Sequence, residues 1–209
     1  CIRDRQRRHQ KVLEETPSPG VTPDEIKRIG KICSDAVSKM KYEGAGTIEF
    51  LYENKEFFFI EMNTRLQVEH PITEAVFGID LVKEQIRVAS GMDMSLSQEG
   101  LKPQGHAIEC RINAERLPSF SPSPGNINEF HSPGGIGIRM DSAIYNGFKV
   151  PPFYDSLIGK LIVHADSRSL ALSRLSRALD ELIIDGVHTT MDLFKEIIDE
   201  KDFKSGDYN

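Results

Sequence analysis

Two neighbouring runs rich in aromatic and β-branched residues most constrain the fold of this 209-residue chain. The runs Thr47–Glu53 and Glu56–Asn63 are separated only by the polar pair Asn54-Lys55. Such runs favour β-strands, and a two-residue polar gap is typical of a tight hairpin turn. The chain is therefore expected to contain an antiparallel hairpin, in which residues on the two arms lie opposite each other.

The register of this hairpin decides whether two acidic side chains meet. A two-residue turn at Asn54-Lys55 places Glu49 and Glu61 on opposite faces, whereas a three-residue turn places them directly across from each other. Opposed carboxylates destabilise a sheet by up to about 1 kcal/mol, and a divalent cation between them reverses that penalty. Glutamate and asparagine oxygens are ligands that Mg²⁺ accepts. Two interpretations stay open: a metal site at Glu49, Glu61 and Asn63, or a solvated strand face.

The loop after the hairpin carries polar side chains at alternate positions of the sequence Arg65-Leu66-Gln67-Val68-Glu69. If it is extended, Arg65, Gln67 and Glu69 point to one side. A guanidinium beside an amide suits a small planar oxyanion, and a neighbouring carboxylate suits proton abstraction. The alternative is a surface ion pair between Arg65 and Glu69, worth less than about 1 kcal/mol.

The rest of the chain shows both helical and strand periodicity. We expect helices over residues 22–40, 80–90, 167–182 and 190–199, and strands over 3–7, 107–115, 126–131, 136–141 and 156–164. The first helix opens on a capping box at Thr22-Pro23-Asp24-Glu25, and its apolar residues predict one buried stripe. Polarity rises over 97–104, so we divide the chain into domains 1–96 and 97–209. The predicted fold class is α+β with a mostly antiparallel sheet.

Composition excludes several classes of partner. A net charge of −6 disfavours nucleic acid or an anionic membrane as a general partner. No apolar run approaches the roughly 18 residues that a membrane helix needs, and no apolar core of a signal peptide follows the N-terminal arginines. The 3 cysteines match neither a disulfide framework nor a zinc site, which favours a reducing, cytoplasmic location. Because the chain begins with Cys1, we expect it to be a piece of a longer polypeptide.

The run Glu61-Met62-Asn63-Thr64-Arg65-Leu66-Gln67-Val68-Glu69-His70-Pro71 resembles the signature of biotin carboxylases in the ATP-grasp superfamily. Further segments resemble the same family in the same order, at residues 6–12, 105–115, 122–125, 151–156 and 181–186. The resemblance covers essentially the whole chain. It predicts the C-terminal part of an ATP-grasp fold in residues 1–96, followed by the family's β-rich C-terminal domain in residues 97–209.

The resemblance also implies an activity, the ATP- and bicarbonate-dependent carboxylation of biotin on a carrier protein through carboxyphosphate. We expect this to be the first half-reaction of an acetyl-CoA carboxylase in fatty acid biosynthesis. The alternatives are the same domain of a pyruvate or acyl-CoA carboxylase, or a non-catalytic domain that binds only metal or nucleotide. Because the family's glycine-rich phosphate loop is not in this sequence, we expect the isolated chain to be inactive.

The implied cofactors are two Mg²⁺ or Mn²⁺ ions bound with ATP, and biotin arrives as a carrier-bound substrate. The implied protein partners are the biotin carboxyl carrier protein, carboxyltransferase subunits and a second copy of the enzyme. Family members are commonly homodimers through this region, and residues 136–139 are the expected contact.

Individual residues acquire roles from the resemblance. Glu49, Glu61 and Asn63 correspond to ligands of the metal ions on the ATP phosphates, so Glu49 and Glu61 also belong to the ATP site. His9 corresponds to a residue that contacts ATP, and the alternative is an ordinary strand histidine. Lys11 belongs to the bicarbonate site.

The other members of the bicarbonate site lie in the loop, at Arg65, Gln67 and the backbone N–H of Val68. Glu69 corresponds to the base that removes the bicarbonate proton, and Arg65 and Glu69 are therefore candidate catalytic residues. Arg111, the third, corresponds to the group that binds biotin and stabilises its enolate oxygen, a charge present only transiently. The alternative for Arg111 is a solvent-facing arginine among polar neighbours.

Overall fold

The computed structural model describes residues 1–7 and 10–207 of the chain. Its largest element is a five-stranded antiparallel sheet of order β1-β2-β5-β12-β10. These strands are β1 (Arg3–Arg7), β2 (Gln10–Thr16), β5 (His106–Asn113), β12 (Leu157–Ala165) and β10 (Ile138–Ser142). The N-terminal strands β1 and β2 are thus in the same sheet as strands from beyond residue 97. The domain division at 96/97 stays a prediction, and the sheet is continuous across it.

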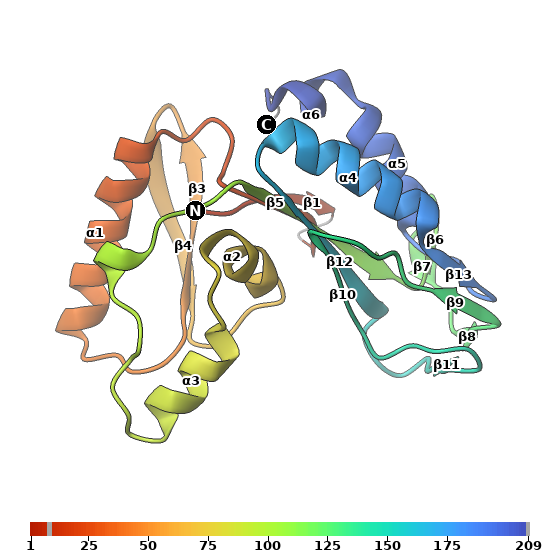
Figure 1. Cartoon of the computed structure of the whole chain (residues 1–209), viewed down its shortest axis with the longest axis horizontal. Helices are drawn as coiled ribbons and strands as arrows, with labels where there is room; N and C mark the ends of the chain where they lie inside the picture. The colour runs from red at the N-terminus through yellow and green to blue at the C-terminus, as the bar shows by residue number, and fades with distance from the viewer. Residues whose placement is uncertain (8–9, 208–209) are drawn as a thin grey trace.

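Helices cover both faces of this sheet (Figure 1). On one face lie α4 (Arg168–Glu181), α5 (Met191–Asp199) and α6 (Lys201–Ser205), packed on a core that includes Leu13, Ile108 and Cys110. On the other face, α2 (His70–Phe77) buries Ile72 and Val76 against Ala107 and Ile162. Because both faces of β5 are covered, its alternating polar side chains are buried as well as its apolar ones.

A hairpin of β3 (Thr47–Glu53) and β4 (Glu56–Asn63) forms a separate two-stranded sheet. Of the two turn lengths left open, the structure has the two-residue turn, with Asn54 and Lys55 both in the left-handed region at φ 51° and 65°. Near the turn Phe50 pairs with Phe59, but the register then shifts and Glu49 pairs with Glu61. The shift leaves Ile60 as an extra, bulged residue in β4. The hairpin therefore has the short turn of one predicted register and the opposed glutamates of the other.

Helix α1 (Pro23–Lys39) lies beside this hairpin (Figure 1). Its capping box is confirmed, because the Glu25 N–H donates to Thr22 Oγ1 and the Thr22 N–H donates to the Glu25 carboxylate. The expected buried stripe is wrong, since no residue of α1 is buried. A two-stranded hairpin is a narrow surface, and a cavity of about 310 Å³ lined by Cys33, Val37 and Met62 remains between helix and hairpin.

Several other elements agree with the sequence patterns. Helix α3 (Leu81–Ala89) begins after its N-cap Asp80, α4 begins after Ser167, and α5 matches the predicted 190–199. The strand predicted over 126–131 is divided into β8 (Gly125–Asn126) and β9 (Glu129–His131). The α+β class with antiparallel sheets is confirmed.

The sequence patterns missed the remaining elements. These are β2, α2, α6, the 3₁₀ turn at Gln98–Gly100, and the short strands β6 (Glu115–Arg116), β7 (Ser121–Pro122), β11 (Lys149–Val150) and β13 (Ile183–Asp185). Most are too short to show a period. None of the helices within residues 1–7 and 10–207 is long and apolar enough to cross a membrane.

Candidate functional site

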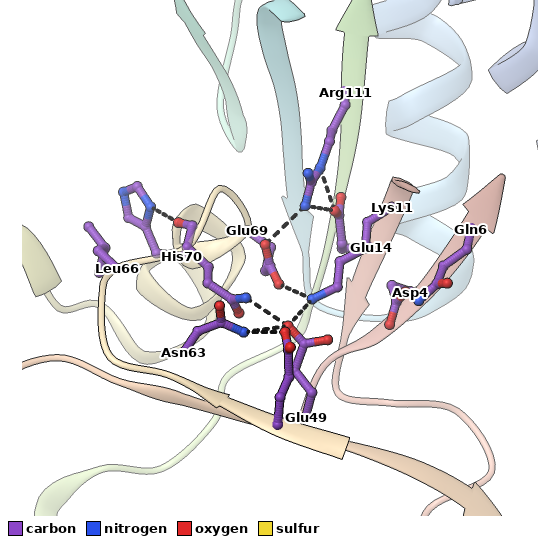
Figure 2. Close-up of polar contacts among 12 residues, drawn as sticks. Asp4, Gln6, Lys11, Glu14, Glu49, Asn63, Leu66, Glu69, His70 and Arg111 are labelled. Carbon is purple, nitrogen blue, oxygen red and sulfur yellow. Dashed lines mark hydrogen bonds and ion pairs between the residues drawn. The ribbon is translucent and has the colours of Figure 1, made fainter. Parts of the chain in front are cut away.

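The predicted site residues converge where the hairpin, the loop before α2 and strands β2 and β5 meet (Figure 2). Hydrogen bonds and ion pairs connect them in the order Asn63, Glu49, Lys11, Glu69 and Arg111. These residues are far apart in the sequence, and Lys11 and Glu69 alone are separated by 58 positions. The convergence is therefore a product of the fold, to which the hairpin, the loop before α2 and the strands β2 and β5 all contribute.

Glu49 is the acceptor at the centre of the hairpin side of the site. Its Oε1 accepts hydrogen bonds from Lys11 Nζ at 2.9 Å, Asn63 Nδ2 at 3.1 Å and Gln67 Nε2 at 2.7 Å. Partial burial by itself would raise the pKa of Glu49, but the bonds from Lys11 and Gln67 outweigh it and hold that pKa below its ordinary value. Glu49 is therefore a permanent negative charge at neutral pH.

The three predicted metal ligands lie next to one another. Glu49 and Glu61 are cross-strand partners, and Asn63 Nδ2 donates to Glu49 Oε1 and, at 2.8 Å, to Glu61 Oε1. No group of three or more His, Cys, Asp or Glu side chains that could hold a metal ion occurs among the described residues. Two carboxylates and one amide nevertheless fit Mg²⁺, which needs only one or two protein carboxylates when phosphates and water complete its shell. The donor set thus fits a metal ion that is shared with a phosphate ligand.

Lys11 connects the metal side of the site to the loop. Its Nζ donates to Glu49 Oε1 at 2.9 Å and to Glu69 Oε1 at 2.7 Å, and its side chain is only 15% exposed. Burial by itself would lower the pKa of Lys11, but the hydrogen bonds to Glu69 and Glu49 outweigh it and raise that pKa. Lys11 therefore supplies a stable positive charge between two carboxylates, as an anion site requires.

The loop is not extended as the alternate spacing suggested, and its side chains diverge. Gln67 points inward to Glu49, and its own Oε1 is a buried acceptor without a hydrogen-bond partner in the described part of the chain. Arg65 is exposed, and its guanidinium contacts Asn63 Oδ1 at 3.4 Å. The predicted surface ion pair between Arg65 and Glu69 does not form, because Glu69 is buried and bound to other cations.

Arg111 completes the chain of contacts on the sheet. Its Nη2 donates to Glu69 Oε2 at 3.0 Å and its Nε donates to Glu14 Oε1 at 2.6 Å. The solvent-facing alternative for Arg111 is wrong, since its side chain is 12% exposed. The reason is α2, which covers this face of β5 and brings Glu69, the residue just before the helix, onto the guanidinium.

Three charged groups beside this site, of which Glu14 and Glu109 are fully buried, were not predicted from the sequence. Glu14 on β2 binds Arg111, Glu109 on β5 is the cross-strand partner of Glu14, and Lys160 on β12 donates to the Val68 carbonyl oxygen at 3.1 Å. The predicted β5 strand contained a signal, because Glu109 lies two positions from Arg111 and so shares its face. Glu14 and Lys160 had none without the sheet order. His9 lies outside the described residues.

Comparisons with known proteins agree with this geometry. Residues 1–97 match the family described as "Carbamoyl-phosphate synthase L chain, ATP binding domain", and residues 109–209 match "Biotin carboxylase C-terminal domain". The biotin carboxylase of Haemophilus influenzae is 55% identical over 204 residues, which cover 98% of this chain and 46% of that protein. One subunit of the pyruvate carboxylase of Methanothermobacter thermautotrophicus is 54% identical over 203 residues, which cover 97% of this chain and 41% of that protein.

Among solved structures, the biotin carboxylase domain dimer of the Hydrogenobacter thermophilus 2-oxoglutarate carboxylase, in complex with MgADP, ADP and bicarbonate, is similar with a TM-score of 0.95. It is 45% identical, and the match covers 98% of this chain and 46% of that chain. This chain thus spans about half the length of the relatives that it matches.

The chain thus joins part of an ATP-binding domain to a biotin carboxylase C-terminal domain. The chain belongs to the biotin carboxylase family of the ATP-grasp superfamily, and it corresponds to the C-terminal half of those proteins.

Proposed function

We propose that this chain is the second half of a biotin carboxylase, which uses ATP and bicarbonate to carboxylate biotin on a carrier protein. The observation that carries the proposal is the unbroken chain of polar contacts from Glu49 through Lys11 and Glu69 to Arg111. It joins a carboxylate pair suited to a metal–phosphate complex to a buried arginine suited to an anionic oxygen. A reaction that makes carboxyphosphate at one end and uses it at the other needs these sites to adjoin.

On the hairpin side, Glu49, Glu61 and Asn63 hold Mg²⁺ or Mn²⁺ on the ATP phosphates. Bound there, the metal ion neutralises phosphate charge during transfer of the γ-phosphoryl group. Glu49 and Glu61 thereby belong to the nucleotide site, and His9 is proposed as a further ATP contact.

Bicarbonate binds between Lys11 and the loop, where Arg65, Gln67 and the Val68 N–H complete its site. The Lys11 ammonium supports this placement, since its Nζ lies 2.7 Å from Glu69 Oε1 and its side chain is only 15% exposed. Glu69 takes the bicarbonate proton on a carboxylate oxygen, so that the resulting dianion attacks the γ-phosphorus of ATP and ADP leaves. Lys11 and Arg111, both within 3.0 Å of Glu69, orient that carboxylate.

Carboxyphosphate then breaks down to CO₂ and phosphate, and the phosphate removes the ureido proton of biotin. Arg111 stabilises the negative oxygen of the biotin enolate, which attacks CO₂. Because Arg111 is 12% exposed and enclosed by the sheet and α2, its charge acts at low local dielectric, where a hydrogen bond to a developing oxyanion is strongest.

For the parent enzyme we propose an acetyl-CoA carboxylase of fatty acid biosynthesis, with the carrier protein and carboxyltransferase subunits as partners and the cytoplasm as location. The proteins named biotin carboxylase among its relatives support this choice. A pyruvate or 2-oxoglutarate carboxylase is the second candidate, favoured by relatives with those names. We further propose a homodimer through residues 136–139, where Ile136 is 91% exposed.

Replacing the proposed base tests this function. In the complete enzyme, Glu69→Gln keeps the size of the side chain but removes its ability to accept a proton. We expect the rate of biotin carboxylation to fall 10²- to 10⁴-fold, as is typical of a lost general base. Formation of ADP with bicarbonate and biotin present is the measurement. Glu53→Gln, an exposed glutamate at the far end of the hairpin, is the matched control.

An unchanged carboxylation rate in Glu69→Gln, with normal folding, would remove Glu69 as the base.

A further inference from the structure

The guanidinium of Arg111 is held between two carboxylates that come from different elements. Glu14 Oε1 accepts from Arg111 Nε at 2.6 Å and lies 2.5 Å from Nη2, whereas Glu69 Oε2 accepts from Nη2 at 3.0 Å. Figure 2 shows the guanidinium pointing between these two acids. Glu14 therefore binds the guanidinium along the edge formed by Nε and Nη2. Nη1 makes no hydrogen bond within residues 1–7 and 10–207.

Glu14 lies where a carboxylate is costly. Its side chain is 0% exposed, and its Oε2 has no hydrogen-bond partner in the described part of the chain. In the sheet it lies directly between Asp4 on β1 and Glu109 on β5, so two further acids flank it. Burial raises the pKa of Glu14 to about 7, and Arg111 lowers it only in part. Such a residue is tolerated in a core because it has a specific partner, and that partner is Arg111.

The two acids that hold Arg111 are not equivalent during the proposed reaction. Glu69 accepts the bicarbonate proton, and once it is neutral its attraction for the guanidinium weakens. Glu14 is fully buried and cannot contact a substrate. Only Glu14 is therefore available as a fixed anchor when Arg111 turns from Glu69 to the oxygen of biotin.

We propose that Glu14 is a positioning residue, which holds the Nε edge of Arg111 so that its free Nη1 faces the ureido oxygen of biotin. This inference rests on the proposed function, because it assigns to Arg111 the binding of biotin. Glu14 acts through Arg111 alone and makes no contact with a substrate.

The test compares substitutions at three positions in the complete enzyme. Glu14→Gln keeps the size and one acceptor oxygen but loses the charge, and Glu14→Ala loses both. We expect the KM for biotin to rise about tenfold or more in Glu14→Ala and by a smaller factor in Glu14→Gln, with a much smaller change in the KM for bicarbonate. A KM does not depend on the fraction of enzyme that is folded, so partial unfolding does not imitate this result.

Glu109→Gln is the matched control. Glu109 is as deeply buried as Glu14, on the same face of the sheet, but it makes no hydrogen bond to Arg111. Its KM for biotin is expected to stay within twofold of that of the parent. Arg111→Ala is the reference for complete loss of the biotin contact.

Glu14 variants that keep the parent's KM for biotin, while Arg111→Ala loses it, overturn the positioning role and leave the proposed function intact. A lower kcat with unchanged KM values for both substrates also overturns it, because that pattern is structural. If Arg111→Ala itself keeps the parent's KM for biotin, the role of Arg111 in the proposed function fails instead.

Discussion

The hairpin β3–β4 and the five-stranded sheet provide opposite ends of one polar chain, yet they are packed very differently. The hairpin is covered on one side by α1, of which no residue is buried, and Leu51 and Phe59 are 64% exposed. The strand β5 is covered on both faces, and Ile108, Cys110 and Ile112 are fully buried. The proposed metal ligands thus lie on a loosely packed element, and the proposed biotin arginine lies on a strand whose neighbouring apolar residues are fully buried.

This difference matches the two tasks. A metal ion bound with a nucleotide brings its own charge and coordination geometry, so its ligands can be positioned in part by the ligand itself. A developing oxyanion cannot position its hydrogen-bond donors in this way, so the arginine that stabilises it must already be in place. The contrast predicts that the free energy of folding is concentrated in the sheet and that the hairpin can adjust.

The first and largest expected effect tests whether the sheet contributes more to the free energy of folding than the hairpin does. Leu179→Ala in α4 removes a fully buried side chain and should lower the free energy of unfolding by about 2–5 kcal/mol. Ile29→Ala in α1 removes a half-buried side chain and gains helix propensity, so it should cost less than about 1 kcal/mol. Urea unfolding followed by far-UV circular dichroism is the measurement, since the chain has 0 tryptophans. Equal losses in the two variants would contradict the comparison.

The second effect is the pH dependence of the free energy of unfolding, which arises from two glutamates of the sheet. Burial raises the pKa of Glu14 to about 7 and that of Glu109 well above its ordinary value, so the folded state binds protons that the unfolded state has released. That contribution to stability is complete below pH 4.5, the ordinary value, and is lost as the pH rises through about 7. We expect the free energy of unfolding to fall between pH 5 and pH 8 by up to about 3 kcal/mol.

Glu109→Gln sharpens this prediction because an amide cannot ionise. Because burial raises the pKa of Glu109 in the folded state, the unfolding free energy of this variant should decline less than that of the parent over the same pH range. The groups that face this pair are Arg111, Asp4, Glu69 and Lys160, and none of them is changed. An identical decline in the parent and in the variant would show that Glu109 carries no proton in the folded state.

How much of this could be predicted depended on whether the deciding interactions were local. The capping box of α1 and the position of the turn at Asn54-Lys55 are set by adjacent residues, and both were predicted, whereas the length of the turn was left open. Burial of Arg111 depends on α2, an eight-residue helix whose segment, beginning at His70-Pro71, reads as a loop. Glu14 looks like a charged surface residue until its strand is placed beside β5. Long-range strand order is the information that local periodicity does not contain.

The bulge at Ile60 belongs to the same category, and it supports the smallest of the expected effects. Glu49 and Glu61 are opposite each other only because the register shifts between Glu49 and Phe50. Deleting Ile60, whose side chain is half exposed, removes the extra residue while the two-residue turn remains. Continued pairing from the turn then places Glu61 opposite Glu49 and Asn63 opposite Thr47, so the deletion removes the bulge and keeps both pairs.

Because the two glutamates stay paired, we expect this deletion to change the binding of Mn²⁺ in the presence of ADP by less than about twofold, measured by titration of the complete enzyme. The loosely packed hairpin should accept the change without unfolding the sheet, so the circular dichroism melting transition assigned to the sheet should move little. A deletion variant that binds Mn²⁺ about tenfold or more weakly would mean that pairing of the two glutamates is not enough to form the metal site. A deletion that unfolds the whole chain would mean that the hairpin is as integral to the fold as β5, and the contrast between the two regions would not hold.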